Sequence, residues 1–110
     1  MVVISFFRHS NGRKICGFSI SGHAGFGSFG KDVLCAAISS AVYLVINTVT
    51  DVIKVKPLVL EVFDGDLEFV LKSRDADICE LLIKGLELHL SEMSKQYSKN
   101  MLVKYRNIKE

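Results

Sequence analysis

The sequence predicts an α+β fold, a two-layer, mainly antiparallel sheet with two helices, in the order β-β-α-β-β-α-β. Three observations lead to this fold class: two turn signals that each join a pair of β-rich runs, one long uncharged stretch, and one amphipathic run near the C-terminus. With 110 residues the chain is long enough for a single domain, residues 1–110, whose core needs no metal or disulfide.

Five runs are predicted as strands: 1–9, 14–22, 58–63, 67–72 and 101–105. The first two are joined by Asn11-Gly12, and the next two by an Asp-Gly-Asp sequence at 64–66; both are hairpin signals, because these residues tolerate positive φ. In the second run Cys16, Phe18 and Ile20 alternate with other residues, so we expect all three on the covered face of the sheet, with Cys16 as a small core residue.

Two helices complete the pattern. No charged residue lies between Asp32 and Asp51, and this stretch is barely long enough to span a bilayer. We expect instead a central buried helix with Asp32 as its N-cap, covered on more than one side by the sheet and a second subunit. The second helix is expected over 76–98, with Asp77 and Glu80 as a variant of the capping box.

Composition limits the possible partners. A formal net charge of +2 is too small to indicate nucleic-acid binding, and the N-terminus lacks the features of a signal peptide. Cys16, Cys35 and Cys79 are odd in number and have no metal-ligand spacing, which favours a reducing cytoplasm and no metal or cofactor. We therefore expect a cytoplasmic protein without a membrane span.

One histidine and one cysteine stand out as a candidate catalytic pair. His23 ends the second strand, and Cys35 falls in the first turn of the helix that follows, where the helix dipole favours a thiolate. A neighbouring imidazole can accept the thiol proton, so the two residues are the minimum parts of a cysteine nucleophile and its base. The alternative is that Cys35 is one more small apolar residue and His23 an exposed turn residue.

The segment between the pair forms a candidate substrate loop, whose glycines permit close approach of a peptide backbone. Its candidate substrate-contacting residues are Gly25, Phe26, Gly27, Phe29 and Gly30, together with Gly22, which directly precedes His23. The phenylalanines either form an apolar lid or anchor the loop in the core. Ser39 lies one turn beyond Cys35, where its hydroxyl orders the site or bonds its own helix backbone. His9 and His89 are expected at the surface.

The string Gly22-His23-Ala24-Gly25 … Gly30-Lys31-Asp32-Val33-Leu34-Cys35-Ala36-Ala37-Ile38-Ser39, with eleven residues between His and Cys, resembles the ribosomal-processing cysteine protease family, Prp, of Firmicutes and related bacteria. The resemblance implies a homodimer that removes a short N-terminal extension from a large-subunit ribosomal protein, cutting in an apolar, aromatic-containing segment. Carried over by position, Cys35 is the nucleophile and His23 the general base and later acid. Asp32 and Ser39 are supporting residues, and Asp32 either orients His23 or only caps the helix.

Two other functions stay open on the sequence alone. The first is a non-catalytic, ribosome-associated binding protein of the same fold. The second is a thiol redox protein, which is disfavoured because no second cysteine stands beside Cys35 in the sequence. Cys16 can approach Cys35 only if the first hairpin folds over the helix.

Overall fold

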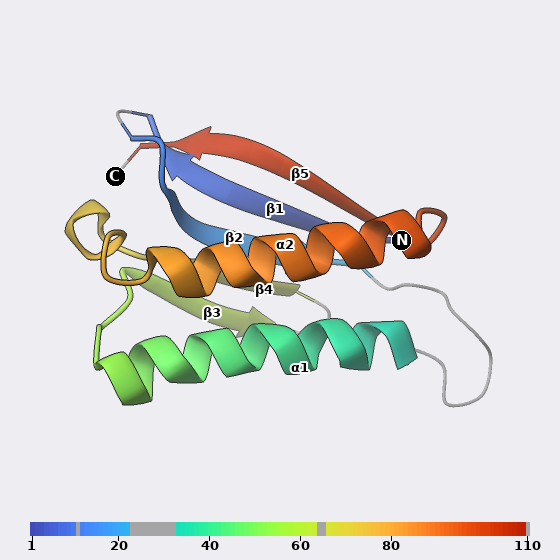
Figure 1. Cartoon of the computed structure of the whole chain (residues 1–110), viewed down its shortest axis with the longest axis horizontal. Helices are drawn as coiled ribbons and strands as arrows, with labels where there is room; N and C mark the ends of the chain where they lie inside the picture. The colour runs from blue at the N-terminus through green and yellow to red at the C-terminus, as the bar shows by residue number, and fades with distance from the viewer. Residues whose placement is uncertain (11, 23–32, 64–65, 110) are drawn as a thin grey trace.

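The computed structural model describes residues 1–10, 12–22, 33–63 and 66–109. It contains a five-stranded sheet and two long helices, both on one face of the sheet (Figure 1). Along the chain the elements are β1 (Val2–His9), β2 (Ile15–Ser21), α1 (Val33–Asn47), β3 (Val59–Phe63), β4 (Asp66–Val70), α2 (Glu80–Gln96) and β5 (Met101–Ile108). The predicted fold class and element order are confirmed.

The strands lie side by side in the order β3-β4-β2-β1-β5. Both predicted hairpins form antiparallel pairs, and β2 pairs antiparallel with β4 in the middle of the sheet. β5 is parallel to β1, because α2 carries the chain back across the sheet before β5 begins. The sheet is therefore mostly antiparallel, as predicted, with one parallel pair at an edge. β3 occupies the opposite edge.

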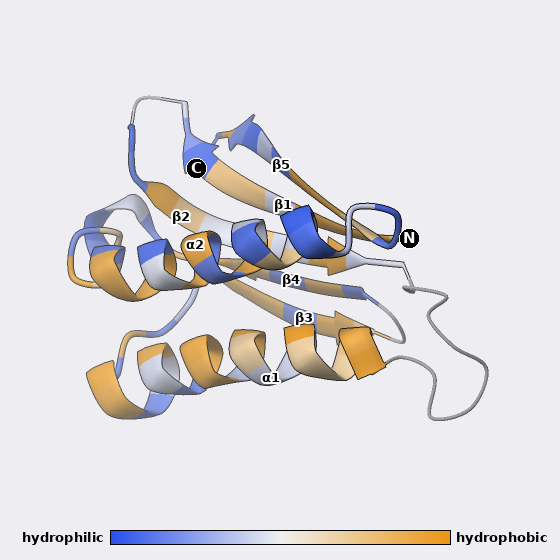
Figure 2. Ribbon diagram, turned by 45° about the vertical axis from the view of Figure 1, so that its right-hand side comes forward, coloured by the Kyte–Doolittle hydropathy of each residue, from blue (hydrophilic) through white to orange (hydrophobic). Residues whose placement is uncertain are grey.

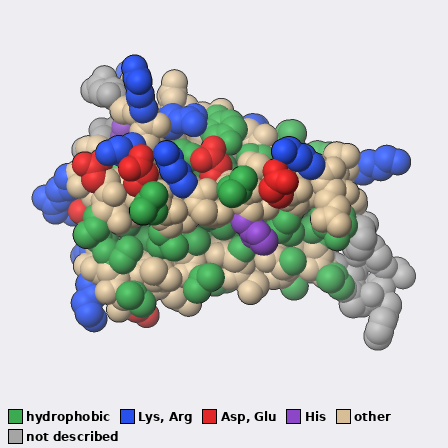
Figure 3. All heavy atoms as spheres, viewed as in Figure 1, with side chains coloured by type: hydrophobic (Ala, Val, Ile, Leu, Met, Phe, Trp, Pro, Cys, Tyr) green, Lys and Arg blue, Asp and Glu red, His purple; other side chains and the backbone are tan. Residues whose placement is uncertain are grey.

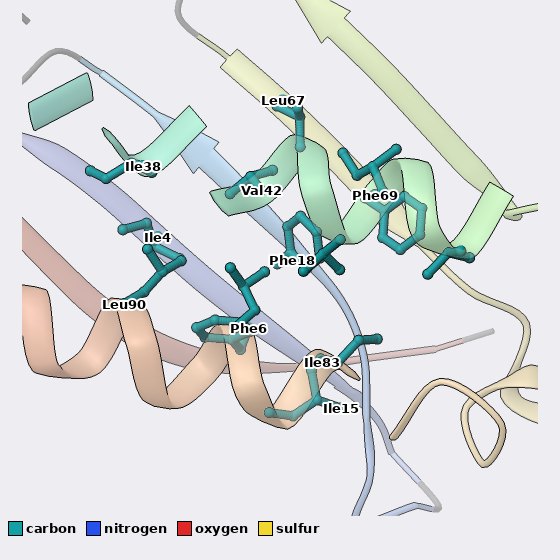
Figure 4. Packing of buried hydrophobic residues seen from close by; sticks show 14 of the residues in the cluster. Ile4, Phe6, Ile15, Phe18, Ile38, Val42, Leu67, Phe69, Ile83 and Leu90 are labelled. Carbon is teal, nitrogen blue, oxygen red and sulfur yellow. The ribbon is translucent and has the colours of Figure 1, made fainter. Parts of the chain in front are cut away.

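The main core lies between the sheet and the two helices (Figure 4). Its largest members are fully buried side chains from every layer, including Ile4, Phe6, Phe18, Phe69, Ile38, Val42, Ile83 and Leu90. The rings of Phe18 and Phe69 stack with their centroids 5.1 Å apart. Burial of one such side chain contributes about 1.5–3 kcal/mol, so this layer fixes where α1 sits on the sheet.

A β-bulge overturns the predicted orientation of Cys16. Phe7 pairs with Gly17 but Arg8 pairs with Ile15, so Cys16 is an extra residue in β2. The bulge reverses the alternation, and Ile15 joins the main core. Cys16 is fully buried, as expected, but it packs with Phe7 in a second cluster on the sheet face away from the helices.

The start of the second helix also differs from the prediction. A 3-10 turn, Ser73–Asp75, follows β4, and α2 begins only at Glu80 rather than at residue 76. Asp77 does not form a capping box, because its carboxylate pairs with Lys14 and its backbone carbonyl accepts a hydrogen bond from the amide of Glu80 (3.3 Å). Cys79 is the N-cap residue and makes no side-chain cap hydrogen bond.

α1 runs on into a π-helical turn, Thr48–Ile53, and the whole span Val33–Ile53 is long and apolar enough to cross a membrane by length and composition. Core helices of soluble proteins have the same length and composition, but only 33% of the most apolar part of this helix is buried. Apolar residues cover most of the helix surface (Figure 2), and outward-facing ones such as Leu44 are exposed. A single chain therefore covers α1 only in part, whereas the sequence predicts that this helix is covered on more than one side.

Candidate active site

Cys35 lies on the flank of the buried stripe of α1. In the described part of the chain the helix begins at Val33, which places Cys35 in its first turn, as predicted. The preceding residue, Leu34, and Ile38 one turn on are both buried against the sheet. Cys35 is itself half-buried and packs against this core, so its thiol is held in place by the helix while one side stays open.

The open side of Cys35 forms part of a groove of about 270 Å³. One wall comes from the same flank of α1, namely Cys35, Ser39 and Tyr43, which follow one another at four-residue spacing. The opposite wall comes from the second hairpin and consists of Val62, Phe63, Asp66 and Leu67. Most of the residues that line the groove are therefore apolar, and Asp66 adds one carboxylate.

Gly22 closes the groove at the end of β2. Its φ of +86° lies in the left-handed region, and an added Cβ would collide with the backbone carbonyl oxygen of Met1. Only glycine fits this position without strain. Gly22 and Cys35, which lie on either side of residues 23–32 in the sequence, line the same groove.

Three predicted site residues are thus brought together in one groove: Cys35, Ser39 and Gly22. Ser39 is exposed there. The other predicted site residues lie outside the described residues: His23, Gly25, Phe26, Gly27, Phe29, Gly30 and Asp32. Their roles stay predictions.

Sequence reasoning missed part of the groove wall. The spacing of Cys35, Ser39 and Tyr43 would have identified Tyr43, because residues four apart share a helix face. No local signal identifies Val62 and Phe63, since they reach the groove only through the strand order of the sheet.

The other two cysteines sit in very different surroundings. All three are thiols rather than disulfides. Cys16 lies on the opposite sheet face from Cys35, which argues against the redox alternative, because the sheet separates the two sulfur atoms. Cys79 is fully buried; this burial, with a smaller contribution from the nearby Asp75 charge, raises the pKa of its thiol.

Neither described histidine lines the groove. His9 was expected at the surface, but it is buried, and its Nε2 donates a hydrogen bond to the carbonyl oxygen of Leu71 (3.3 Å). His89 is exposed on α2, as expected. Among the described residues, no three His, Cys, Asp or Glu side chains are grouped so that they could hold a metal ion.

A thiol held in the first turn of a helix and open to a groove is suited to act as a cysteine nucleophile, the reacting group of the cysteine proteases. Comparison with known proteins agrees with this class. The family model described as Cysteine protease Prp matches residues 1–102, and the chain belongs to that family.

A curated relative, the Ribosomal processing cysteine protease Prp of Bacillus subtilis, is 30% identical over 102 residues, covering 87% of this chain and 90% of the relative. The solved structure of the Prp protease of Staphylococcus aureus with a covalently linked product peptide has a TM-score of 0.84. It is 20% identical and covers 96% of this chain and all of that one. A second structure of that protease, in complex with a substrate peptide, gives a TM-score of 0.81 at 19% identity, covering 96% of this chain and all of that one. These structures share the fold.

The surroundings of the three thiols predict an order of reactivity. Iodoacetamide near neutral pH should alkylate Cys35 first, at least about tenfold faster than Cys16 or Cys79, because the thiolate reacts and only Cys35 is open to the reagent. The raised pKa of Cys79 leaves little thiolate until the pH rises well above neutral. Peptide mapping by mass spectrometry measures the three rates, and alkylation in denaturant is the control. Equal rates in the folded protein would contradict the assigned geometry.

Proposed function

We propose that this protein is a cysteine endopeptidase that removes the N-terminal extension of a bacterial large-subunit ribosomal protein. The proposal rests above all on one observation: the half-buried Cys35 opens onto the groove between α1 and the β3–β4 hairpin. Membership of the Prp family supports it, and relatives are named as ribosomal processing proteases.

In the first chemical step, His23 takes the proton from Cys35 and the thiolate sulfur attacks the scissile carbonyl carbon. A C–S bond forms and the carbonyl π electrons move to oxygen. Backbone amides at the start of α1 are well suited to stabilise this oxyanion, since they point toward the helix N-terminus. Support for His23 comes from its neighbour in sequence, Gly22, which lines the groove with Cys35.

In the second step the tetrahedral intermediate collapses. The C–N bond breaks, and the imidazolium of His23 gives its proton to the leaving amine, which is the new N-terminus of the mature ribosomal protein. Water, deprotonated by His23, then attacks the thioester carbonyl. The C–S bond breaks, and Cys35 regains its proton as the extension departs with a free carboxylate.

The remaining predicted site residues have supporting roles in this proposal. Ser39, one turn from Cys35 on the groove wall, hydrogen-bonds substrate or orders the first turn of α1. Asp32 caps the helix or orients His23. Close to the thiol, the glycine-rich loop that starts at Gly22 folds over the bound peptide, with Phe26 and Phe29 on its apolar side.

We further propose that residues 1–110 form a single domain of a cytoplasmic protein, which binds neither membrane nor nucleic acid directly. The modest net charge of +2 supports the last point, because phosphate-backbone binding needs a concentrated basic surface. Lys/Arg and Asp/Glu side chains are interspersed on the face shown in Figure 3.

The direct test is mass spectrometry of the purified protein mixed with the extended ribosomal protein of the same bacterium. The wild type should make a single cut near the N-terminus, and Cys35→Ala and His23→Ala should lose about a thousandfold or more of the rate. Ser39→Ala should slow cleavage, whereas Ser98→Ala, at an exposed serine that lines neither this groove nor the groove between the two helices, should not. Cleavage by Cys35→Ala would contradict the proposal, and so would no cleavage by folded, reduced wild type.

We also propose a homodimer formed through the helix layer. Leu44 of α1 and Leu81 of α2 are 66% and 84% exposed and line an apolar groove of about 660 Å³ between the two helices. Sedimentation velocity at micromolar concentration should show a dimer, and Leu81→Glu should weaken it. Ile78→Glu, an equally polar change outside this groove, is the matched control. A wild-type monomer would contradict the proposal.

A further inference from the structure

β3 is an edge strand whose outer side is open. Among the described residues it pairs only with β4, so the amide N–H and carbonyl groups on its other side face away from the sheet. Such an edge is a template for an added strand, and many peptide-binding domains use one in this way.

The side chains of β3 on the helix side are also uncovered. Leu60 pairs with Phe69 and Val62 pairs with Leu67, so each pair points toward the helix layer. On β4, Phe69 is 0% and Leu67 is 8% exposed, whereas their partners on β3, Leu60 and Val62, are 42% and 53% exposed. The helix layer therefore ends above β4 and leaves an apolar strip along β3.

This strip is continuous with the groove beside Cys35. Val62 and Phe63, the last two residues of β3, line that groove together with the thiol and Tyr43. A peptide that lies with its scissile bond at Cys35 can therefore extend directly onto β3. No other described strand edge reaches Cys35, because β5 lies at the far side of the sheet.

The opposite face of β3 carries negative charge. Glu61 stands directly across from Glu68 on β4, a like-charge pair that is unfavourable unless a cation lies close by. Both line a cleft of about 260 Å³, which shares Ile20, Phe63, Asp66 and Leu67 with the groove at Cys35. The two faces of β3 thus offer apolar contacts on one side and carboxylates on the other.

We propose that the substrate segment beside the scissile bond binds as a sixth strand along the free edge of β3. Its alternate side chains, which are the apolar and aromatic ones, lie on Leu60 and Val62, and the intervening ones, which are cationic, lie beside Glu61 and Glu68. The inference rests on the proposed function, since a ribosomal protein binds RNA phosphates and is rich in Lys and Arg. It adds the binding mode and the charge of the recognised segment.

The test uses Cys35→Ala, which holds the peptide uncut, and a fluorescently labelled peptide spanning the cleavage site. Its backbone amides are N-methylated one at a time, and affinity is measured by fluorescence anisotropy. Strand addition predicts losses of about tenfold or more at every second residue, because only alternate N–H groups face β3. Uniform tolerance, losses confined to the two residues at the scissile bond, or no binding of the unmodified peptide would overturn it.

A charge-reversal arm tests the acidic face. Glu61→Lys should weaken binding of the peptide at low salt by about tenfold, and should not weaken binding of a peptide whose Lys and Arg are replaced by Gln. Glu92→Lys, the same change on the exposed surface of α2, is the matched control and should leave affinity unchanged. Equal affinity of Glu61→Lys and wild type would overturn the charge assignment. Wild type that binds the peptide in this mode but does not cleave it would instead refute the proposed function.

Discussion

Burial of one face of α1 against the sheet is the constraint on which the rest of the structure depends. Leu34, Ile38 and Val42 follow one another at four-residue spacing and meet the core formed by Phe18 and Phe69. Because these contacts fix the rotation of the helix, the adjacent flank carries Cys35, Ser39 and Tyr43 into the groove. Loss of this packing would displace the Cys35 thiol from the groove without changing its chemistry.

The sheet order supplies the second half of the site. β4 lies between β2 and β3, so the second hairpin extends the sheet beyond the cover of α1. The result is a groove with a helix on one side and an edge strand on the other. An extended peptide can contact both walls, and Cys35 and Gly22 line the same groove. The groove beside Cys35 therefore depends on the strand order of the sheet, which no single sequence motif determines.

Much of the fold follows from local sequence. The alternation around Phe18, the two hairpin signals and the long apolar run of α1 predict the element order, because each depends on neighbours in the chain. The strand order and the bulge at Cys16 depend on distant pairing, which a single sequence does not reveal. The start of α2 was misjudged because Asp77 pairs with Lys14, a residue on another hairpin.

The same distinction applies to the site. Cys35 and Ser39 were recognisable because helix spacing and the resemblance of their motif point to them. Val62 and Phe63 were not, since nothing near them in the sequence connects them with Cys35. His9 was misplaced at the surface because the carbonyl of Leu71, its partner, is reached only through the sheet.

The most direct test of the account is to trap the covalent intermediate. Wild-type protein is mixed with the extended ribosomal protein, quenched in acid at short times, digested and mapped by mass spectrometry. We expect a thioester on the peptide that contains Cys35. This peptide is then heavier than its unmodified form by the mass of the released extension less one water. Cleavage with no adduct on that peptide at any time, or with the adduct on another residue, would contradict it.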